Sequence, residues 1–329
     1  MVSKRTAYLP AVIDGNKWGA IFTDAVLWQP VVRRICQEMG LAPALSIKSG
    51  YPGSCAVFIV DREIVLKLYP PLFAADFERE LIVYEAIQDR LAHIPRVLAH
   101  GVYADRMDWP YVILSFCPGV PIREIDHHLS RANKESIGLD LGRLIRDLHH
   151  SPLPERLATS WQHWRDFLLE NRGRTLRHLR QERPFSGQVI DEIELVLSDT
   201  EGEWLVEQPL CLINADLTQD HLLLVQEKWG WKISAVIDWA DAEVGVPAYE
   251  WIPLWYGLCQ RDELLFQHIL AAYDPLLNLD ESLSRELLTY TFLHRFGGEI
   301  IVQELKQLGK PAVRNLAELQ TLFCRQTQS

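Results

Sequence analysis

The chain has 329 residues, and its 33 Lys and Arg against 44 Asp and Glu give a formal net charge of −11. Hydrophobic residues make up 48% and charged residues 23%, the usage of a soluble globular protein, which excludes a disordered chain and a fibrous repeat. The acidic balance argues against nucleic acid and an anionic membrane as partners, because both require clustered Lys and Arg. It is compatible with a cationic small molecule.

The sequence also bounds the compartment. No stretch approaches the roughly 18 consecutive apolar residues of a membrane span, and Pro10 and Asp14 interrupt the N-terminal region before an apolar core of signal-peptide length can form. The six cysteines are scattered without a C-x-x-C pair, which favours reduced thiols over a disulfide framework or a zinc site. We therefore expect a cytoplasmic protein.

The first part of the chain predicts a β-rich lobe. A two-residue turn at Asp61 and Arg62 separates two apolar segments and predicts a hairpin. Pro118 and Gly119 end the last predicted strand of this region. The predicted elements are strands at 54–60, 63–69 and 111–117, with a helix at 73–91.

Beyond Pro118 the pattern becomes mostly helical. Apolar residues at a 3.6-residue period mark a helix over 137–148, and further helical patterns extend to the C-terminus. Two short strands are predicted at 210–213 and 232–237. The layout predicts an α+β fold with a small β-rich lobe at 1–117, a larger helical lobe at 118–329, and a ligand cleft between them.

A glycine-containing loop precedes the hairpin. Gly50 and Gly53, followed by Ser54, would let backbone N–H groups approach phosphate oxygens closely. A Gly/Pro pair before a strand is, however, more often a plain turn. The sequence contains no G-x-x-x-x-G-K-[ST] motif, which excludes a P-loop nucleotide site.

A lysine and a glutamate in this lobe are predicted to pair. Lys67 lies inside a strand, and alone it would be read as an edge or snorkelling lysine. Glu80 falls on the apolar stripe of the following helix, where a carboxylate is costly unless it is paired. A strand lysine held by a helix glutamate is the phosphate clamp of kinases.

The strongest chemical pattern lies in the second lobe. Asp216 stands in a loop between two apolar strands, His221 follows five residues later, and Asp238 ends the next strand. These residue types suit a Mg²⁺-nucleotide site, in which Asp216 orients a hydroxyl group and the other two hold the metal. The alternative role for such strand-end aspartates is to cap turns.

These motifs resemble those of the aminoglycoside phosphotransferase family, small-molecule kinases with a protein-kinase-like fold. The family's catalytic loop reads His-Gly-Asp, with Asn or His five residues after the Asp, and here Asn214-Ala215-Asp216 precedes His221. Its second motif, Ile-Asp-Phe-x-Asp-Ala, is matched by residues 237–242. The flanks are similar to those of hygromycin B 7''-O-kinases, at residues 27–34, 65–68, 109–112, 141–149 and 286–294.

The resemblance implies a phosphotransferase that uses ATP or GTP with Mg²⁺ and an alcohol group as acceptor. Lys67 would contact the nucleotide α- and β-phosphates while Glu80 holds it, and residues 115–117, including Ser115 and Cys117, would form the hinge that meets the adenine. In the second lobe Asp216 would be the catalytic base, and the metal ligands would be His221 and Asp238.

The chain departs from the family pattern at several positions. Asn214 replaces the His that braces the catalytic loop, and Ala215 replaces the Gly, which would cost on the order of 1 kcal/mol if the position requires a positive φ. Val246 replaces the middle Asp of a Gly-Asp-Pro motif, and Glu250 stands at a later acidic position.

Three other interpretations compete with an active small-molecule kinase. A catalytically silent, ligand-binding kinase fold is motivated by Asn214 and Ala215, but the other expected residues are all present. A protein kinase lacks its H-R-D, D-F-G and A-P-E landmarks here. A metal-dependent hydrolase lacks any H-x-x-x-H or D-x-D ligand pair and would use Asp216, Asp220, His221 and Asp238.

The sequence says less about the acceptor molecule than about the nucleotide site. The net charge suggests a cationic acceptor bearing a hydroxyl group, such as an aminoglycoside. The biological role could then be either antibiotic resistance or a step in making a natural product. The acidic residues that could line its pocket, if they are not solvated surface charges, are Glu124, Asp126, Asp241, Glu243, Glu250 and Asp262. The tryptophans that could wall it, if they do not pack in the core, are Trp239, Trp251 and Trp255.

Overall fold

The computed structural model describes residues 9–10, 14–22, 24–41, 46–50, 53–157, 159–199, 206–309 and 312–324. The chain divides into two compact units. The first comprises Met1–Val120 with two later segments, Leu223–Val225 and Ser234–Asp241, and the second comprises Pro121–Leu222, Gln226–Ile233 and Ala242–Ser329. The predicted boundary after residue 117 did not anticipate the two late segments of the first unit.

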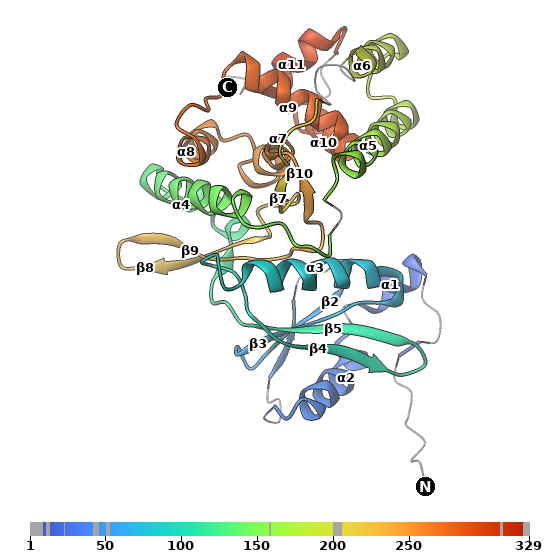
Figure 1. The fold of residues 1–329 in the computed structure, drawn as a ribbon, viewed down its shortest axis with the longest axis vertical. Helices are drawn as coiled ribbons and strands as arrows, with labels where there is room; N and C mark the ends of the chain where they lie inside the picture. Colours follow the sequence, from blue (N-terminus) through green and yellow to red (C-terminus); the bar gives the residue numbers. More distant parts are fainter. Residues whose placement is uncertain are drawn as a thin grey trace. The chain divides into compact units, whose positions relative to one another are not determined.

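The first unit is built on a five-stranded antiparallel sheet in the order β1-β2-β3-β5-β4 (Figure 1). The predicted hairpin is present: Asp61 and Arg62 both have positive φ, at 53° and 58°, and the Glu63 N–H donates to the Val60 carbonyl over 3.0 Å. This backbone twist matches that of the two flanking strands. The strands are β1 Ile47–Ser49, β2 Ala56–Val60, β3 Ile64–Leu68, β4 Val97–Ala104 and β5 Asp108–Ser115.

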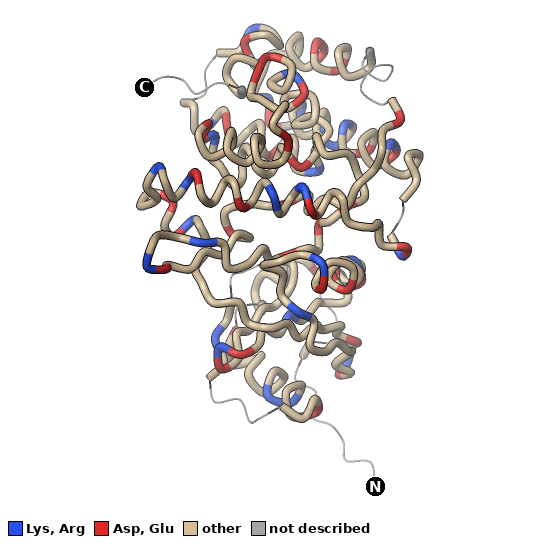
Figure 2. Tube along the Cα trace, turned by 60° about the vertical axis from the view of Figure 1, so that its left-hand side comes forward, with Lys and Arg blue, Asp and Glu red and all other residues tan. Residues whose placement is uncertain are grey.

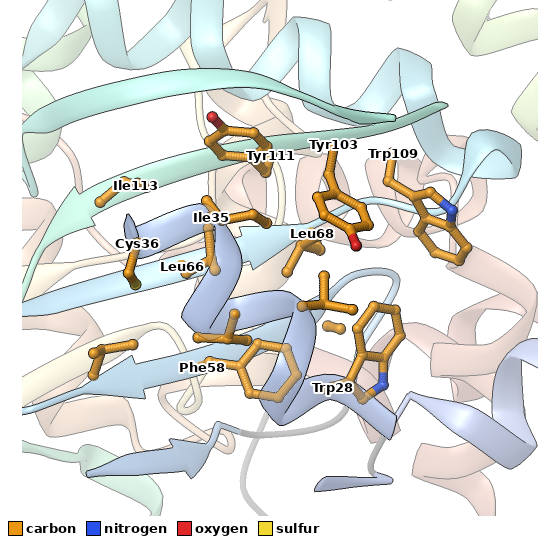
Figure 3. Close-up of a cluster of buried hydrophobic side chains, with 14 of the residues drawn as sticks. Trp28, Ile35, Cys36, Phe58, Leu66, Leu68, Tyr103, Trp109, Tyr111 and Ile113 are labelled. Carbon is orange, nitrogen blue, oxygen red and sulfur yellow. The ribbon is translucent and has the colours of Figure 1, made fainter. Parts of the chain in front are cut away.

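Helices cover both faces of this sheet (Figure 1). On one face α2 (Ala25–Glu38), which follows α1 (Gly15–Ile21), packs an apolar stripe onto the strands, as Figure 3 shows for Trp28 and Ile35 against Phe58, Leu66 and Leu68. The sequence reading did not predict these two helices. On the other face lies α3, Ala74–Ile87.

Strand alternation then separates the two faces of β3. Its even-numbered apolar residues belong to the core under α2, whereas Lys67 is 6% exposed and makes contact with α3. The sheet therefore directs Lys67 to the helix that carries Glu80, as the sequence pattern predicted.

The second unit is mostly helical (Figure 1). The predicted stripe at 137–148 lies within α4, which packs on α8. The two helices approach closely at Gly142, where a Cβ would overlap the Ile269 carbonyl oxygen, so the absence of a side chain permits this contact. Its helices are α4 Arg131–His149, α5 Trp161–Glu182, α6 Gly187–Asp199, α7 Pro247–Ile252, α8 Glu263–Tyr273, α9 Glu281–Leu293, α10 Gly297–Gln307 and α11 Leu316–Cys324, with a π-helical turn at Pro253–Leu258.

Short strands connect these helices. In the second unit β7 (Cys211–Ile213) pairs antiparallel with β10 (Glu243–Gly245), so that Glu243 lies opposite Ile213. The strands β6 Val120–Pro121, β8 Leu222–Glu227 and β9 Gly230–Val236 form a separate sheet.

The described residues also show how charge is distributed, whether a helix could cross a membrane, and the state of the cysteines. Lys and Arg are interspersed with Asp and Glu along both units (Figure 2). In the part of the chain that the structure describes, no helix has the length and apolarity needed to cross a membrane. The cysteines with described side chains, at positions 36, 55, 117, 211 and 259, are free thiols.

Candidate active site

The predicted pair of Lys67 and Glu80 is present in the first unit. Lys67 Nζ lies 2.7 Å from Glu80 Oε1, and Glu80 is fully buried at the middle of α3. Lys67 Nζ also lies 3.3 Å from Oδ1 of Asp238, which belongs to the same unit. The fold thus brings together one cation and two carboxylates that are far apart in the sequence.

Two further donors hold the buried glutamate in place, and the sequence reading missed both. The Tyr69 hydroxyl donates to Glu80 Oε2, and the Trp239 backbone N–H donates to Glu80 Oε1 over 3.2 Å. Tyr69 directly follows β3 and is two residues from Lys67, so it faces the same side of the sheet; this alternation is the signal that could have found it. The carboxylate is consequently fixed in position as well as neutralised.

The opposite charges of this cluster stabilise each other's ionised forms. Burial by itself lowers the pKa of Lys67, but the carboxylates of Asp238 and Glu80 outweigh it and hold that pKa well above its usual value. Burial raises the pKa of Glu80, while the Lys67 charge acts in the opposite direction. Lys67 is therefore a permanently charged, oriented ammonium group.

Asp238 itself has an unusual backbone. Its φ is 64°, in the left-handed region that non-glycine residues rarely adopt. Its side chain is 41% exposed although it contacts the buried Lys67. Strain of this kind persists only where the surroundings impose it, and here the neighbouring Trp239 N–H is bound by Glu80.

The predicted nucleotide loop and hinge also lie in the first unit. A Cβ on Gly50 would lie 2.8 Å from a methyl carbon of Val57, so this glycine permits close packing of the loop on β2, while Gly53 and Ser54 are exposed; residues 51–52 of the loop lie outside the described residues. The Ser115 N–H donates to the Arg96 carbonyl over 2.8 Å, and Cys117 is half-buried. The roles of these residues towards a nucleotide stay predictions.

The loop before Asp216 is fixed by side chains of the second unit. Glu250, in α7, is fully buried, and its Oε2 accepts the backbone N–H groups of Asn214 over 2.7 Å and Ala215 over 3.3 Å. Asn214 Oδ1 in turn accepts the Asp216 N–H over 3.1 Å. Asn214 therefore braces the loop as an acceptor, and the Asp216 side chain keeps 25% of its surface exposed.

Ala215 lies in the left-handed conformation, which is costly for a residue with a Cβ. Its φ is 64°, and the residue is completely buried. Its carbonyl oxygen lies 3.3 Å from Nε2 of His294, which follows α9. In the sequence His294 falls within a flanking stretch, and no local pattern signals its contact with a residue 79 positions away.

His221 is held by the same loop. Its Nδ1 lies 2.6 Å from the Asp216 carbonyl oxygen, which can only accept, so Nδ1 carries the proton. In the neutral imidazole Nε2 then carries the lone pair that a metal ligand needs. Within the described residues no three His, Cys, Asp or Glu side chains gather as a metal site. His221 belongs to the second unit and Asp238 to the first, and their roles as metal ligands stay predictions.

Several residues considered for the acceptor pocket have other roles. Glu250 is buried and binds the backbone of the loop before Asp216, so it is not a surface charge. Glu243 Oε1 lies 2.6 Å from Arg295 Nη2, and Asp262 caps α8 and pairs with Lys134 at 2.5 Å. The three tryptophans proposed as walls are fully or almost fully buried and pack in the core: Trp239, Trp251 and Trp255.

Comparisons with known proteins agree with this geometry. Residues 47–283 match the model of the phosphotransferase enzyme family. The streptomycin–ATP complex of APH(2'')-IIa is 16% identical, with 91% of this chain and 98% of that chain covered and a TM-score of 0.60. The GDP and kanamycin complex of APH(2'')-IIIa is 16% identical, with 85% and 93% covered and a TM-score of 0.63.

A third solved structure is an aminoglycoside phosphotransferase, APH(3'')-Id, from Streptomyces rimosus. It is 17% identical, with 81% of this chain and 98% of that chain covered and a TM-score of 0.55. At these identities the likeness shows the fold. The predicted α+β, protein-kinase-like architecture, with a small sheet-based lobe and a larger helical lobe, is confirmed.

Proposed function

Because the chain belongs to the phosphotransferase enzyme family, we propose that it moves the γ-phosphate of ATP or GTP to a hydroxyl group of a small molecule. The observation that carries the proposal is the cluster of the buried Lys67 and Glu80 with the partly exposed Asp238. A lysine fixed by two carboxylates is poorly explained by stability, since a buried ion pair is often no better than apolar packing. It is well explained as a preorganised phosphate contact.

We assign roles on this basis. Lys67 binds the α- and β-phosphates, and the loop that begins at Gly50 covers them with the backbone N–H groups of Gly53 and Ser54, because the Gly50 N–H already donates to the Val57 carbonyl over 2.8 Å. The hinge at Ser115 and Cys117 binds the base. Because the Ser115 and Phe116 N–H groups already donate within the first unit, the Cys117 N–H is assigned to the nucleotide.

In the second unit Asp216 accepts or orients the proton of the acceptor hydroxyl. Its backbone is fixed on both sides, by Asn214 and by His221, which suits a group that must be positioned rather than mobile. His221 and Asp238 would hold Mg²⁺, which neutralises phosphate charge when it is bound. A cytoplasmic location, where ATP and GTP are available, is part of the proposal.

The acceptor class is proposed from charge and from relatives. Relatives of the same fold are described in complex with streptomycin or kanamycin. The net charge of −11 and the similarity to hygromycin B 7''-O-kinases agree with an aminoglycoside or another cationic natural product. Affinity for such an acceptor should weaken with added salt, because exposed charges are screened beyond roughly 8–10 Å.

The test is transfer of radiolabelled phosphate from ATP and GTP to a panel of cationic, neutral and anionic alcohols. Asp216→Asn should lower kcat by about 100-fold or more with the nucleotide Kd nearly unchanged, because the lost interaction acts on the transferring group. Asp220→Asn is the matched control: Asp220 pairs with Arg123 at 2.9 Å on the surface, and its loss should leave kcat unchanged.

The outcomes separate the competing functions. Near-normal turnover of Asp216→Asn would contradict the assigned role. Tight nucleotide binding without transfer to any acceptor would favour a silent ligand-binding protein. Equal losses in the Asp216 and Asp220 variants would favour the hydrolase, which would use both.

A further inference from the structure

The imidazole of His294 has both ring nitrogens assigned by its neighbours. Its Nδ1 accepts the Phe296 backbone N–H over 3.2 Å, so Nδ1 carries no proton. The proton therefore resides on Nε2, which lies 3.3 Å from the Ala215 carbonyl oxygen and donates to it. This tautomer differs from that of His221, where Nδ1 is protonated.

The ring is also fixed in orientation. His294 is 1% exposed and stacks on Tyr249, with ring centroids 4.6 Å apart and an angle of 27° between the planes. The Tyr249 hydroxyl accepts the Arg295 N–H over 2.9 Å, which holds the next residue of the same turn. Burial and the Arg295 charge lower the pKa of His294 to about 3, so the ring is neutral at physiological pH.

The contact with the Ala215 carbonyl matters because this carbonyl belongs to the peptide group that joins Ala215 to Asp216. Ala215 is the left-handed residue directly before Asp216, so a rotation of its peptide group would turn the Asp216 side chain. Glu250, Asn214 and His221 bind the other backbone groups of this loop, and the 215 carbonyl is the group that His294 binds. Asn214 and His294 thus hold the two sides of one peptide group, that between Ala215 and Asp216, while Glu250 and His221 hold the peptide groups before and after it.

We propose that His294 is a positioning residue for Asp216: its Nε2–H holds the Ala215 carbonyl and so fixes the strained peptide that aims the Asp216 carboxylate. The loop-bracing part stands on the contacts alone, and the effect on turnover rests on the proposed phosphotransferase function. Asn214 binds the Asp216 N–H but not this carbonyl, so His294 supplies a bond that the replaced loop residue does not make.

Two substitutions separate the two ring nitrogens. His294→Gln places an amide N–H near the position of Nε2 and keeps the bond to Ala215. His294→Asn keeps an acceptor near the position of Nδ1 for Phe296 but is too short to reach Ala215. Tyr249→Phe is the control for stability, because it leaves the Arg295 N–H without its acceptor and retains the ring stack.

Two measurements are made on each full-length variant. Hydrogen exchange of the segment 211–222 reports whether the loop opens, and steady-state kinetics report kcat and the nucleotide KM. His294→Asn should speed exchange in this segment and lower kcat about 10- to 100-fold with KM within about threefold, since small misplacement of a catalytic group has effects of this size. His294→Gln should restore both, and Tyr249→Phe should resemble the unsubstituted protein in both.

The proposal is overturned if Asn and Gln at position 294 behave alike, if Tyr249→Phe lowers kcat as much as His294→Asn, or if the loop opens without loss of turnover. If the unsubstituted protein transfers no phosphate, the proposed function fails, and hydrogen exchange alone decides whether His294 braces the loop. Failure of the brace with normal transfer would leave the proposed function intact.

Discussion

Replacing Ala215 by glycine tests the backbone strain in the loop before Asp216 directly. An L-residue in the left-handed region costs about 1–2 kcal/mol relative to glycine, and Ala215 has a φ of 64°. The substitution also removes a fully buried methyl group worth about 0.8 kcal/mol and adds about 0.5–1 kcal/mol of unfolded-state entropy. Ala215→Gly should therefore change the free energy of unfolding by less than about 1 kcal/mol in either direction.

Ala242 provides the matched comparison. It is equally buried in the same unit, and its φ is not in the left-handed region. Ala242→Gly loses the same methyl group and gains the same entropy without relief of strain, so it should destabilise by about 1.3–1.8 kcal/mol. The difference between the two substitutions, about 1–2 kcal/mol, measures the strain at position 215.

The assay is urea unfolding followed by tryptophan fluorescence, compared at equal m-values so that the denatured states are alike. Equal destabilisation by Ala215→Gly and Ala242→Gly would refute the strain argument. In parallel, kcat of Ala215→Gly should stay within about threefold of the starting value, because glycine adopts the same backbone and leaves the His294 bond possible.

Three further predictions concern charge, protons and metal. Lys67→Met should lower the free energy of unfolding, measured in urea, by about 3–5 kcal/mol, because Glu80 is left buried without its cation. Adding Glu80→Gln should recover part of that loss. A cost below about 1 kcal/mol for Lys67→Met would contradict the buried pair. Folding lowers the pKa of His294 from 6.5 to about 3, so the unfolded state binds the proton first as the pH falls. The stability that neutral His294 contributes is therefore complete above pH 6.5 and falls towards pH 3 by at most ~1.4 kcal/mol per pH unit. His294→Phe, which retains the neighbouring Arg295 and its partner Glu243, should show a shallower decline of Tm over this range. Mg²⁺ should tighten ATP or GTP binding in calorimetry, and His221→Asn should keep part of its activity because Asn offers an oxygen ligand; nucleotide affinity indifferent to Mg²⁺ would contradict the metal site.

Local patterns in the sequence were sufficient for the hairpin and the ion pair of the first unit. The turn at Asp61 and Arg62 follows from chain geometry over a few residues, and the pairing of Lys67 with Glu80 follows from the cost of a lone buried carboxylate. Both arguments need only neighbours in the sequence and the periods of strand and helix.

The loop before Asp216 shows where such local reasoning no longer suffices. Glu250 looks like a surface charge in the sequence, and only the fold reveals that two backbone N–H groups lie within reach of it. Likewise His294 becomes a partner of Ala215 through the path of α9, which no local pattern encodes. The conditional expectation for Ala215 was sound, but whether its φ is positive depended on contacts made by residues 35 and 79 positions away.

The composition of the first unit has a consequence for how the chain is made. Ser234–Asp241 completes this unit, yet it follows Val120 by more than 110 residues, which at about 5–20 residues per second take roughly 6–24 s to synthesise. During that interval Lys67 and Glu80 have left the ribosome without Asp238 and the Trp239 N–H. The sheet can pair early, but its ionic centre closes only once the later segment emerges. Chimeras that exchange this unit between relatives must therefore carry 223–225 and 234–241 together with 1–120.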